Sequence, residues 1–447
     1  MTEYGLARVD ITPRLGVELY GFGPFLHRHA KAVRTPLYAR ALAASDGDNT
    51  CVVVSCDLVG LSHELVQEAR ERVTAASGVP GKNICYHCTH THSGPATKFG
   101  IGQGEPDLAY LEVLPAKLVE AALQALDDLA PAELRHAVVP CVGIGYNREY
   151  DTRPSLDEAL SDDWRPAMPE ITDTEAHVLR LEGEHGFRGF ASYFSCHPVI
   201  GSASNLYIHG DFPAVATGLL EREHPGSMGL FLQGCEGNVN SCVVHHGEQE
   251  SLLALDVIAS RYARQIRVGL QQAKPLQANG VRAVSGRFPL TRAPLPLERL
   301  QEELAACEAV TKASGAADEA GETRAAAVRA VALRRELARQ ALGEAFDETV
   351  EVQALRLGGI TLVGAPFEIM RRYRVRVQAE FETPVLVMSL TNGASCYAPE
   401  RESFDLPGNY AAQIVPYLVG CPPFAPSVED ELVAAMTTMV REVNAGN

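Results

Sequence analysis

Hydrophobic and polar positions change period several times along the chain, from the alternation of a strand to the spacing of a helix. Apolar, β-rich runs at residues 37–44 and 50–55 flank the turn Asp46-Gly47-Asp48, and this pattern predicts a β-hairpin. The predicted elements that follow are a helix over residues 63–76, a strand over residues 83–88 and an amphipathic helix over residues 108–129. Strands that alternate with helices in this order predict an α/β fold.

A change in composition marks residues 295–344, which are rich in Ala, Glu, Arg and Leu. The small residues 314–317 (Ser-Gly-Ala-Ala) divide this stretch, so we predict two helices that form a hairpin. We expect its charged faces to be solvated surface or a packing arm rather than a binding device. Beyond the hairpin, the pattern predicts strands over residues 350–357, 359–363 and 385–390 and a closing helix over residues 428–444.

The charge of the chain restricts its partners. Its formal net charge is -17, and no dense run of Lys or Arg offsets that charge locally. Phosphates and anionic lipid surfaces are therefore repelled, and we expect no nucleic-acid partner. No stretch approaches the roughly 20 apolar residues that a membrane span needs, and residues 1–10 are polar and acidic. We expect a cytoplasmic protein without a membrane span.

The 11 cysteines are scattered, and many lie in apolar runs such as residues 51–54 (Cys-Val-Val-Val). An odd number at irregular spacing is typical of reduced, buried thiols rather than of a disulfide framework. Cys85 and Cys88 form a CxxC pair, which leaves open half of a structural zinc site or a redox pair. Because the sequence has no second CxxC, buried thiols are the favoured interpretation.

Two histidines follow the predicted strand 83–88, within residues 89–95 (Thr-His-Thr-His-Ser-Gly-Pro). His90 and His92 are two positions apart, so in an extended chain their side chains point to the same side and meet one metal ion or one reacting group. The alternative is a pair of surface histidines in a turn. Their place after a strand, where α/β proteins usually bind ligands, favours a functional site.

A third histidine ends a second apolar run, residues 192–196. His197 is followed by Pro198, which stops strand pairing there. Taken alone, His197 is more typical of a buried core histidine than of a ligand. Asp211 follows in a polar cluster before a predicted helix, and we interpret it as a carboxylate that orients a metal-bound imidazole.

A glycine-rich segment follows the buried strand predicted at residues 229–232. Gly234 and Gly237 allow the backbone to approach a ligand closely, and Asn238 and Asn240 offer amide donors there. An ordinary glycine-rich turn explains the same residues equally well.

Two residues that can bind a metal through oxygen follow the predicted strands 359–363 and 385–390. Glu368 is a hard ligand and Tyr397 carries a phenol, and together with His90 and His197 they match an open, catalytic zinc site with two histidines and one carboxylate. The alternative for Glu368 is an ion pair with Arg371 or Arg372 on a following helix.

These segments, in this order, resemble the neutral (non-lysosomal) ceramidase family and its short bacterial relatives. The similarity begins at residues 7–13, continues through residues 36–42 and 56–58, and is most specific at residues 89–95. By residue, the resemblance implies His90, His197, Glu368 and Tyr397 as zinc ligands, His92 near the reacting carbonyl, the Asn147-Arg148 pair, and Tyr410 close to the site. With the predicted elements, it implies one catalytic domain over residues 1–447, an α/β, mixed-sheet metallohydrolase with the helical hairpin inserted at about residues 295–345.

The chain also departs from this family. Ceramidases carry a Gly-Asp-Val-Ser-Pro loop whose serine takes part in the active site, whereas residues 237–241 here are Gly-Asn-Val-Asn-Ser. Asn240 stands at the serine position, which weakens the case for a nucleophilic serine, although Ser241 is one residue away. We also expect neither a secretion signal nor the immunoglobulin-like domain of the long ceramidases.

The combined expectation is a zinc-dependent amidohydrolase that acts on a small or medium-sized soluble amide rather than on ceramide itself. Zinc lowers the pKa of a bound water toward about 7, and the resulting hydroxide attacks the carbonyl. We assign His92 as general acid and base, Arg148 and Tyr410 as donors to the oxyanion or to a substrate carboxylate, and Asn240 as a substrate-orienting amide. Two alternatives stay open: an esterase or lactonase on the same zinc site, and a catalytically silent ligand-binding protein.

Overall fold

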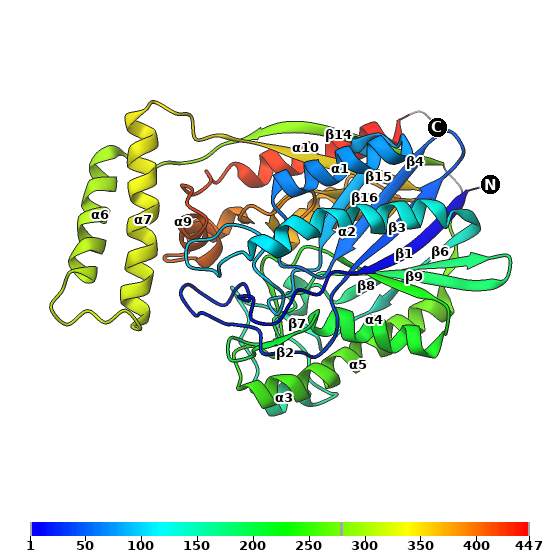
Figure 1. The fold of residues 1–447 in the computed structure, drawn as a ribbon, viewed down its shortest axis with the longest axis horizontal. Helices are drawn as coiled ribbons and strands as arrows, with labels where there is room; N and C mark the ends of the chain where they lie inside the picture. Colours follow the sequence, from blue (N-terminus) through cyan, green and yellow to red (C-terminus); the bar gives the residue numbers. More distant parts are fainter. Residues whose placement is uncertain (1, 278–279, 446–447) are drawn as a thin grey trace.

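Two packed β-sheets form the centre of the molecule, and the computed structural model describes residues 2–277 and 280–445 (Figure 1). Within these residues the larger sheet has nine strands, in the order β11-β9-β8-β6-β1-β3-β4-β5, with β13 paired to β6. Their bounds are β1 Glu3–Asp10, β3 Tyr38–Ser45, β4 Thr50–Cys56, β5 Ile84–Cys88, β6 Ala130–Pro140, β8 Glu175–Gly183, β9 Gly186–Phe194, β11 Met228–Gln233 and β13 Lys274–Pro275. The β4–β5 and β11–β9 pairs are parallel and the others antiparallel, so the sheet is mixed.

The smaller sheet has four strands in the order β14-β15-β16-β18. Their bounds are β14 Val281–Leu290, β15 Glu348–Leu357, β16 Ile360–Gly364 and β18 Val385–Met388. Apolar side chains from both sheets, including Leu42, Val53, Leu355 and Leu362, share one buried core between them. The other face of each sheet is therefore available for helices.

Helices cover the outer faces of both sheets. Helices α1 (His63–Ser77) and α2 (Leu108–Asp127) pack on the β1, β3 and β4 side of the larger sheet, and α4 (Asp211–Glu223) and α5 (Glu248–Gln272) pack on its β6, β8, β9 and β11 side. The smaller sheet is covered by α8 (Arg371–Gln378) and α10 (Val428–Asn444). In the described part of the chain, no helix is both long and apolar enough to cross a membrane.

Short strands and helical turns connect the longer elements. Three two-stranded pairs are β2 (Ala32–Val33) with β10 (Tyr207–Ile208), β7 (Gly145–Asn147) with β12 (Val239–Ser241), and β17 (Glu368–Ile369) with β19 (Tyr397–Ala398). The short helices are α3 (Leu156–Leu160), α9 (Val415–Leu418), the 3-10 turns η1 (Gly81–Asn83), η2 (Pro169–Ile171) and η3 (Arg401–Asp405), and the π-helical turn η4 (Tyr410–Ile414).

The predicted helical hairpin is present as α6 (Leu297–Thr311) and α7 (Gly321–Ala341). It projects from one end of the molecule, beside α9, while both chain termini lie at the opposite end (Figure 1). Its contact with the body is an apolar cluster in which Leu300, Val328 and Leu333 meet Ile101 and Tyr417. The hairpin is thus an arm that packs against the loop preceding α2 and against α9.

The structure confirms the α/β fold with mixed sheets. The predicted β-hairpin is β3–β4, and the predicted closing helix coincides with α10. Helix α2 ends at Asp127, two residues earlier than expected, because β6 begins at Ala130.

The cysteines are free thiols, as the irregular spacing predicted. Cys85 and Cys88 lie on β5 but on opposite faces of the sheet, since Cys85 joins the core between the sheets and Cys88 joins the core under α1 and α2. The CxxC pair therefore forms neither half of a zinc site nor a redox pair.

Candidate active site and metal centre

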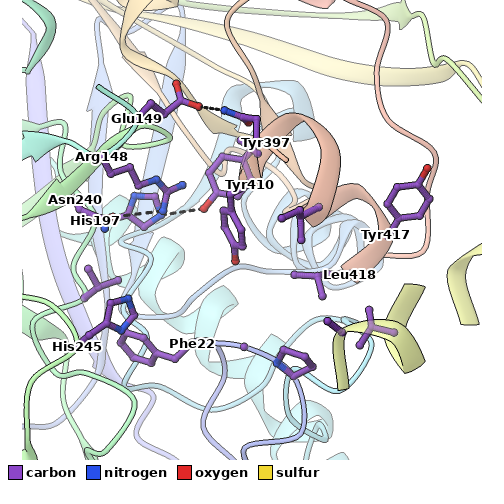
Figure 2. Close-up of a pocket in the computed structure, with 18 of the residues that line it drawn as sticks. Phe22, Arg148, Glu149, His197, Asn240, His245, Tyr397, Tyr410, Tyr417 and Leu418 are labelled. Atoms are coloured by element: carbon purple, nitrogen blue, oxygen red, sulfur yellow. Dashed lines mark hydrogen bonds between the residues drawn. The ribbon is translucent and has the colours of Figure 1, made fainter. Parts of the chain in front are cut away.

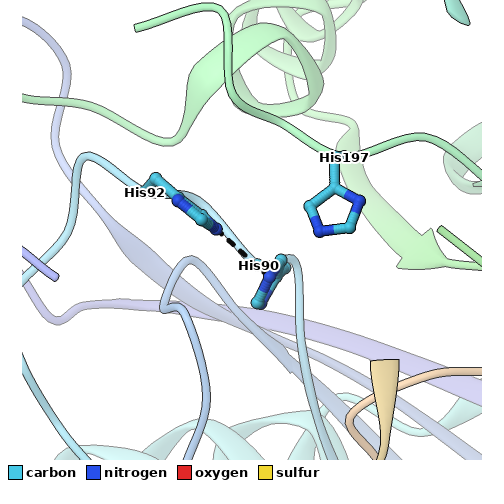
Figure 3. A group of neighbouring side chains, drawn as sticks. All are labelled: His90, His92 and His197. Carbon is cyan, nitrogen blue, oxygen red and sulfur yellow. Dashed lines mark hydrogen bonds between the residues drawn. The ribbon is translucent and has the colours of Figure 1, made fainter. Parts of the chain in front are cut away.

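His90 and His92 lie in the loop that leaves the carboxyl end of β5. The His90 N–H donates to the Leu58 carbonyl at 2.9 Å, and its φ of 70° is in the left-handed region, which is strained for a residue with a Cβ. This bend brings the Nε2 atoms of His90 and His92 to 3.2 Å from each other (Figure 3). The two rings converge as predicted, but through a sharp turn at His90 rather than through an extended strand.

The other ring nitrogen of His90, Nδ1, is already hydrogen-bonded to the backbone. Its Nδ1 lies 2.7 Å from the Val59 carbonyl, which fixes Nδ1 as the protonated donor and leaves Nε2 as a lone-pair donor toward the site. His197 is held in the same way, with Nδ1 at 2.7 Å from the Glu236 carbonyl. His92 differs, because its buried Nδ1 has no hydrogen-bond partner among the described residues.

The backbone places His197 opposite the other two histidines. His197 follows β9, and its N–H donates to the Val239 carbonyl at 2.9 Å, which ties it to the glycine-rich loop. The expected orienting role of Asp211 is wrong. Asp211 instead accepts hydrogen bonds from the backbone N–H groups of Gly201 and Phe212, and the Glu236 carbonyl orients His197.

Glu368 and Tyr397 complete the group through the parallel pairing of β17 and β19, which makes them direct neighbours. Glu368 Oε2 lies 3.1 Å from His197 Nε2 and 3.3 Å from His90 Nε2, and the Tyr397 hydroxyl lies 3.3 Å from His197 Nε2. The alternative ion pair between Glu368 and a following arginine is not formed. Arg372 instead contacts Glu400 and Glu402.

The protonation states of these groups suit a metal ion. Burial lowers the pKa of His197 to about 4 and, with the neighbouring His90, that of His92 well below its usual value, so both rings are neutral at pH 7. Burial on its own raises the pKa of Glu368, but His90 and His197 hold it well below the ordinary range. Neutral imidazoles and an ionised carboxylate are the forms that coordinate metals.

The spacing of the donor atoms also fits a metal ion. Two ligands that each lie about 2.0–2.1 Å from a tetrahedral ion are about 3.3 Å apart. The contacts of His90, His197, Glu368 and Tyr397 described above are 3.1 to 3.3 Å long. The residues present therefore fit a divalent cation with nitrogen and oxygen ligands.

Glu236 is a further acidic group at this centre, and no interpretation of the sequence assigned it a role. It is fully buried, neither carboxylate oxygen has a hydrogen-bond partner of ordinary geometry among the described residues, and it belongs with His90 and Glu368 to a group whose ligand atoms lie within 4.8 Å of one another. Burial and the charge of Glu368 raise its pKa well above the usual value, which the Ser389 hydroxyl only partly offsets. An acidic residue between two glycines after a buried strand was the available signal.

Arg148, Asn240 and Tyr410 line the open side of the centre. Arg148 lies in the loop after β7, where it donates to the Gly237 carbonyl at 2.7 Å and to Asn240 Oδ1 at 3.4 Å. Its guanidinium stacks over the rings of Tyr397 and Tyr410, 5.1 and 5.4 Å from their centroids. Tyr410 begins the π-helical turn η4, a local structure that is frequent at functional sites.

A cavity of about 990 Å³ joins these groups to the outside. Figure 2 shows His197, Arg148 and Tyr397 at its inner part, Phe22 and His245 on one side, and Tyr417 and Leu418 on the other. One face of α7 closes the far wall, so the hairpin does more than the expected surface or packing role. The structure thus brings the eight predicted site residues together. Six of them line the cavity, and His90 and Glu368 lie behind these, in contact with His92 and His197.

Comparisons with known proteins identify relatives of this chain. A family model described as "Neutral/alkaline non-lysosomal ceramidase, N-terminal" matches residues 3–235. The chain is 28% identical over 227 residues to "Neutral ceramidase B" of Dictyostelium discoideum, a match that spans 45% of this chain and 30% of that protein.

Solved structures share the fold. The neutral ceramidase from Pseudomonas aeruginosa superposes with a TM-score of 0.73 at 20% identity, over 99% of this chain and 74% of that one. A structure described as "Ceramidase complexed with C2" gives 0.72 at 19% identity, over 99% and 75% of the two chains.

Proposed function

This chain belongs to the neutral/alkaline non-lysosomal ceramidase family, and from that premise we propose that it is a zinc-dependent hydrolase that cleaves the amide bond of a small or medium-sized soluble substrate. The observation that carries the proposal is the convergence of two anchored imidazoles, a carboxylate and a phenol at 3.1 to 3.3 Å. The names of the relatives support amide hydrolysis, since ceramide is an amide.

We assign the metal to His90, His197, Glu368 and Tyr397. A metal-bound histidine normally donates its other ring N–H to a carbonyl or carboxylate, and both His90 and His197 do so. When bound, zinc supplies a Lewis acid that lowers the pKa of water and polarises the substrate carbonyl.

His92 is assigned a different task because its Nδ1 is not anchored. His92 lacks the hydrogen bond on Nδ1 that metal-bound histidines normally make, and it lines the cavity where a substrate would bind. His92 is neutral at pH 7 in the metal-free chain. We assign it to accept a proton from water as the water oxygen adds to the carbonyl carbon. It then delivers that proton to the leaving nitrogen, the C–N bond breaks, and the products are a carboxylic acid and an amine.

The remaining residues bind the substrate and stabilise developing charge. Arg148 and Tyr410 face the cavity and donate hydrogen bonds to the developing oxyanion or to a substrate carboxylate. Asn240 lines the same cavity and orients the substrate through its side-chain amide. Donors of this kind contribute roughly 2 to 4 kcal/mol to lowering the barrier.

The proposal is tested by measuring the zinc content and the amide turnover of the same protein samples. Elemental analysis of the purified chain should give one zinc per chain, and a chelator should abolish hydrolysis of an amide panel until zinc is restored. His90→Ala and His197→Ala should lose both zinc and turnover, whereas His185→Ala, in the exposed β8–β9 turn, should keep both. Retained turnover in the first two variants contradicts the proposal, and turnover of esters or lactones without amides reassigns the reaction.

A further inference from the structure

The ring of His92 lacks the backbone hydrogen bond that orients His90 and His197. Its buried Nδ1 has no hydrogen-bond partner among the described residues, and its Nε2 lies 3.2 Å from His90 Nε2. Because His90 Nε2 is assigned to the metal, it has no lone pair left to hold His92 once the site is loaded. A fixed His92 ring in the loaded site therefore needs a different support.

Residues 21 and 22 (Gly-Phe) pack directly against this ring. The rings of Phe22 and His92 meet edge to face, with centroids 4.9 Å apart and an interplanar angle of 69°, which is a preferred geometry for aromatic pairs. A Cβ added at Gly21 would lie 2.4 Å from His92 Nδ1, so the glycine backbone closes the space beside that nitrogen. The His92 ring is therefore enclosed on the side where no hydrogen bond holds it.

Arg28 fixes this segment to the backbone of His92. The arginine is buried, and its Nη2 donates to the Tyr20 carbonyl at 3.0 Å and to the His92 carbonyl at 2.5 Å. Its guanidinium also lies 4.8 Å from the centroid of the Phe22 ring. Burial lowers the pKa of Arg28 to about 10, and no carboxylate in the described structure compensates for that burial. The charge of Arg28 is thus used for contacts with two backbone carbonyls and one ring.

The backbone of Phe22 is strained. Its φ of 68° lies in the left-handed region, which is unfavourable for a bulky residue. Strained residues persist only where their surroundings enforce them, and they cluster at active sites. Phe22 lies at the cavity wall beside His245 (Figure 2), in contact with both Arg28 and His92. The strain is therefore associated with a defined contact, that of the Phe22 ring with His92.

We infer that Phe22 is a positioning residue, supported by Arg28, whose ring holds the His92 imidazole with Nε2 toward the metal ligands. The inference rests on the proposed function and adds to it a residue that acts through His92 rather than on the substrate. Without the Phe22 ring, His92 should populate further orientations, and only the chains with the correct orientation are competent in proton transfer. The loss should therefore appear in kcat.

Phe22→Leu removes the ring and keeps an apolar side chain. On the best substrate of the amide panel it should lower kcat at least tenfold and change KM less than twofold, with one zinc per chain. Phe22→Tyr keeps the ring and should retain kcat within threefold. The matched control is Phe25→Leu, in the same loop and with a φ of 59°. Phe25 does not line the cavity, and this variant should behave as the unmodified chain.

A double substitution separates positioning from contact with the substrate. Phe22→Leu in the His92→Gln background should change kcat less than twofold, because the group through which Phe22 acts is absent. A residue that touches the substrate would instead cause the same tenfold loss in both backgrounds, and that result overturns the inference. A raised KM with unchanged kcat in Phe22→Leu overturns it as well.

A crystallographic comparison tests the inference without turnover. In crystals grown with zinc, His92 should adopt one orientation in the unmodified chain and in Phe25→Leu, and a rotated or divided orientation in Phe22→Leu. If Phe22→Leu does not fold, Gly21→Ala takes its place, because its added Cβ should displace the His92 ring.

The two readouts distinguish this inference from the proposed function. If the His92 ring moves in Phe22→Leu but the unmodified chain cleaves no amide, the positioning role stands and the hydrolase proposal fails. If amides are cleaved and neither the ring nor kcat responds to Phe22→Leu, the positioning role fails and the hydrolase proposal stands.

Discussion

At the scale of single residues, the three site histidines differ in one contact that divides their roles. His90 and His197 each place Nδ1 on a backbone carbonyl, at 2.7 Å in both cases, whereas the Nδ1 of His92 has no such partner in the described structure. The sequence singled out His90 and His92 by their spacing and His197 by its place after an apolar run. It did not show this difference, which depends on the carbonyls of Val59 and Glu236 that only the fold brings near.

This difference predicts separate effects of substitution. His92→Gln should lower kcat by about 10²–10⁴ while zinc content stays at one per chain, because a general acid and base is lost but the ligands are kept. His197→Ala should lose the zinc itself. Parallel measurement of kcat and zinc content checks both, and loss of zinc in His92→Gln would contradict the assignment.

Glu236 allows a second prediction at this scale. Burial and the charge of Glu368 raise its pKa and so favour the protonated carboxyl in the metal-free chain, which Gln resembles, whereas a bound cation favours the ionised form. Glu236→Gln should therefore weaken zinc affinity about 10–100-fold and leave the melting temperature of the metal-free chain nearly unchanged. Competition with a chelator measures the affinity, and an unchanged affinity would remove Glu236 from the metal centre.

At the scale of elements, the long strands and helices were predictable and the short ones were not. Strands such as β3 and β4 and helices such as α10 repeat their hydrophobic period often enough to be recognised. The two-residue strands β17 and β19 contain no repeat, yet their pairing makes Glu368 and Tyr397 neighbours. Except for Glu236, the residues of the site were thus recognised in the sequence, while the elements that assemble them depend on long-range pairing.

A glycine shows how tightly these short elements are joined. The Gly237 N–H donates to the Ile369 carbonyl at 2.8 Å, and a Cβ added at Gly237 would lie 2.8 Å from the Glu368 carbonyl oxygen. Gly237→Ala should push β17 away, weaken zinc binding at least tenfold and lower the melting temperature.

The matched control is Gly315→Ala in the loop of the helical hairpin, where an added Cβ meets no atom within 4 Å. Titration calorimetry with zinc and thermal melting of both variants make the comparison. Equal behaviour of the two variants would show that β17 has room to move.

At the scale of the whole molecule, buried neutral histidines make stability depend on pH. Burial lowers the pKa of His87 to about 4 and that of His209 to about 3, below the unfolded value of about 6.5. Between these values the unfolded chain binds more protons than the folded chain, so stability is full above pH 6.5 and is lost as the pH falls toward 4.

Each such histidine should contribute up to about 1.4 kcal/mol per pH unit in that window. Urea unfolding of the metal-free chain at pH 7.5, 6, 5 and 4.5 measures the slope. A free energy of unfolding that stays flat over this range would show that these histidines are protonated in the folded chain.

The central claim is a zinc centre built from nitrogen and oxygen ligands at the inner end of the cavity. X-ray absorption at the zinc edge of the purified chain tests it most directly. We predict one shell of nitrogen and oxygen ligands at about 2.0–2.1 Å with imidazole scattering, which disappears in His197→Ala. The absence of stoichiometric zinc, or a sulfur shell at about 2.3 Å, would contradict the account.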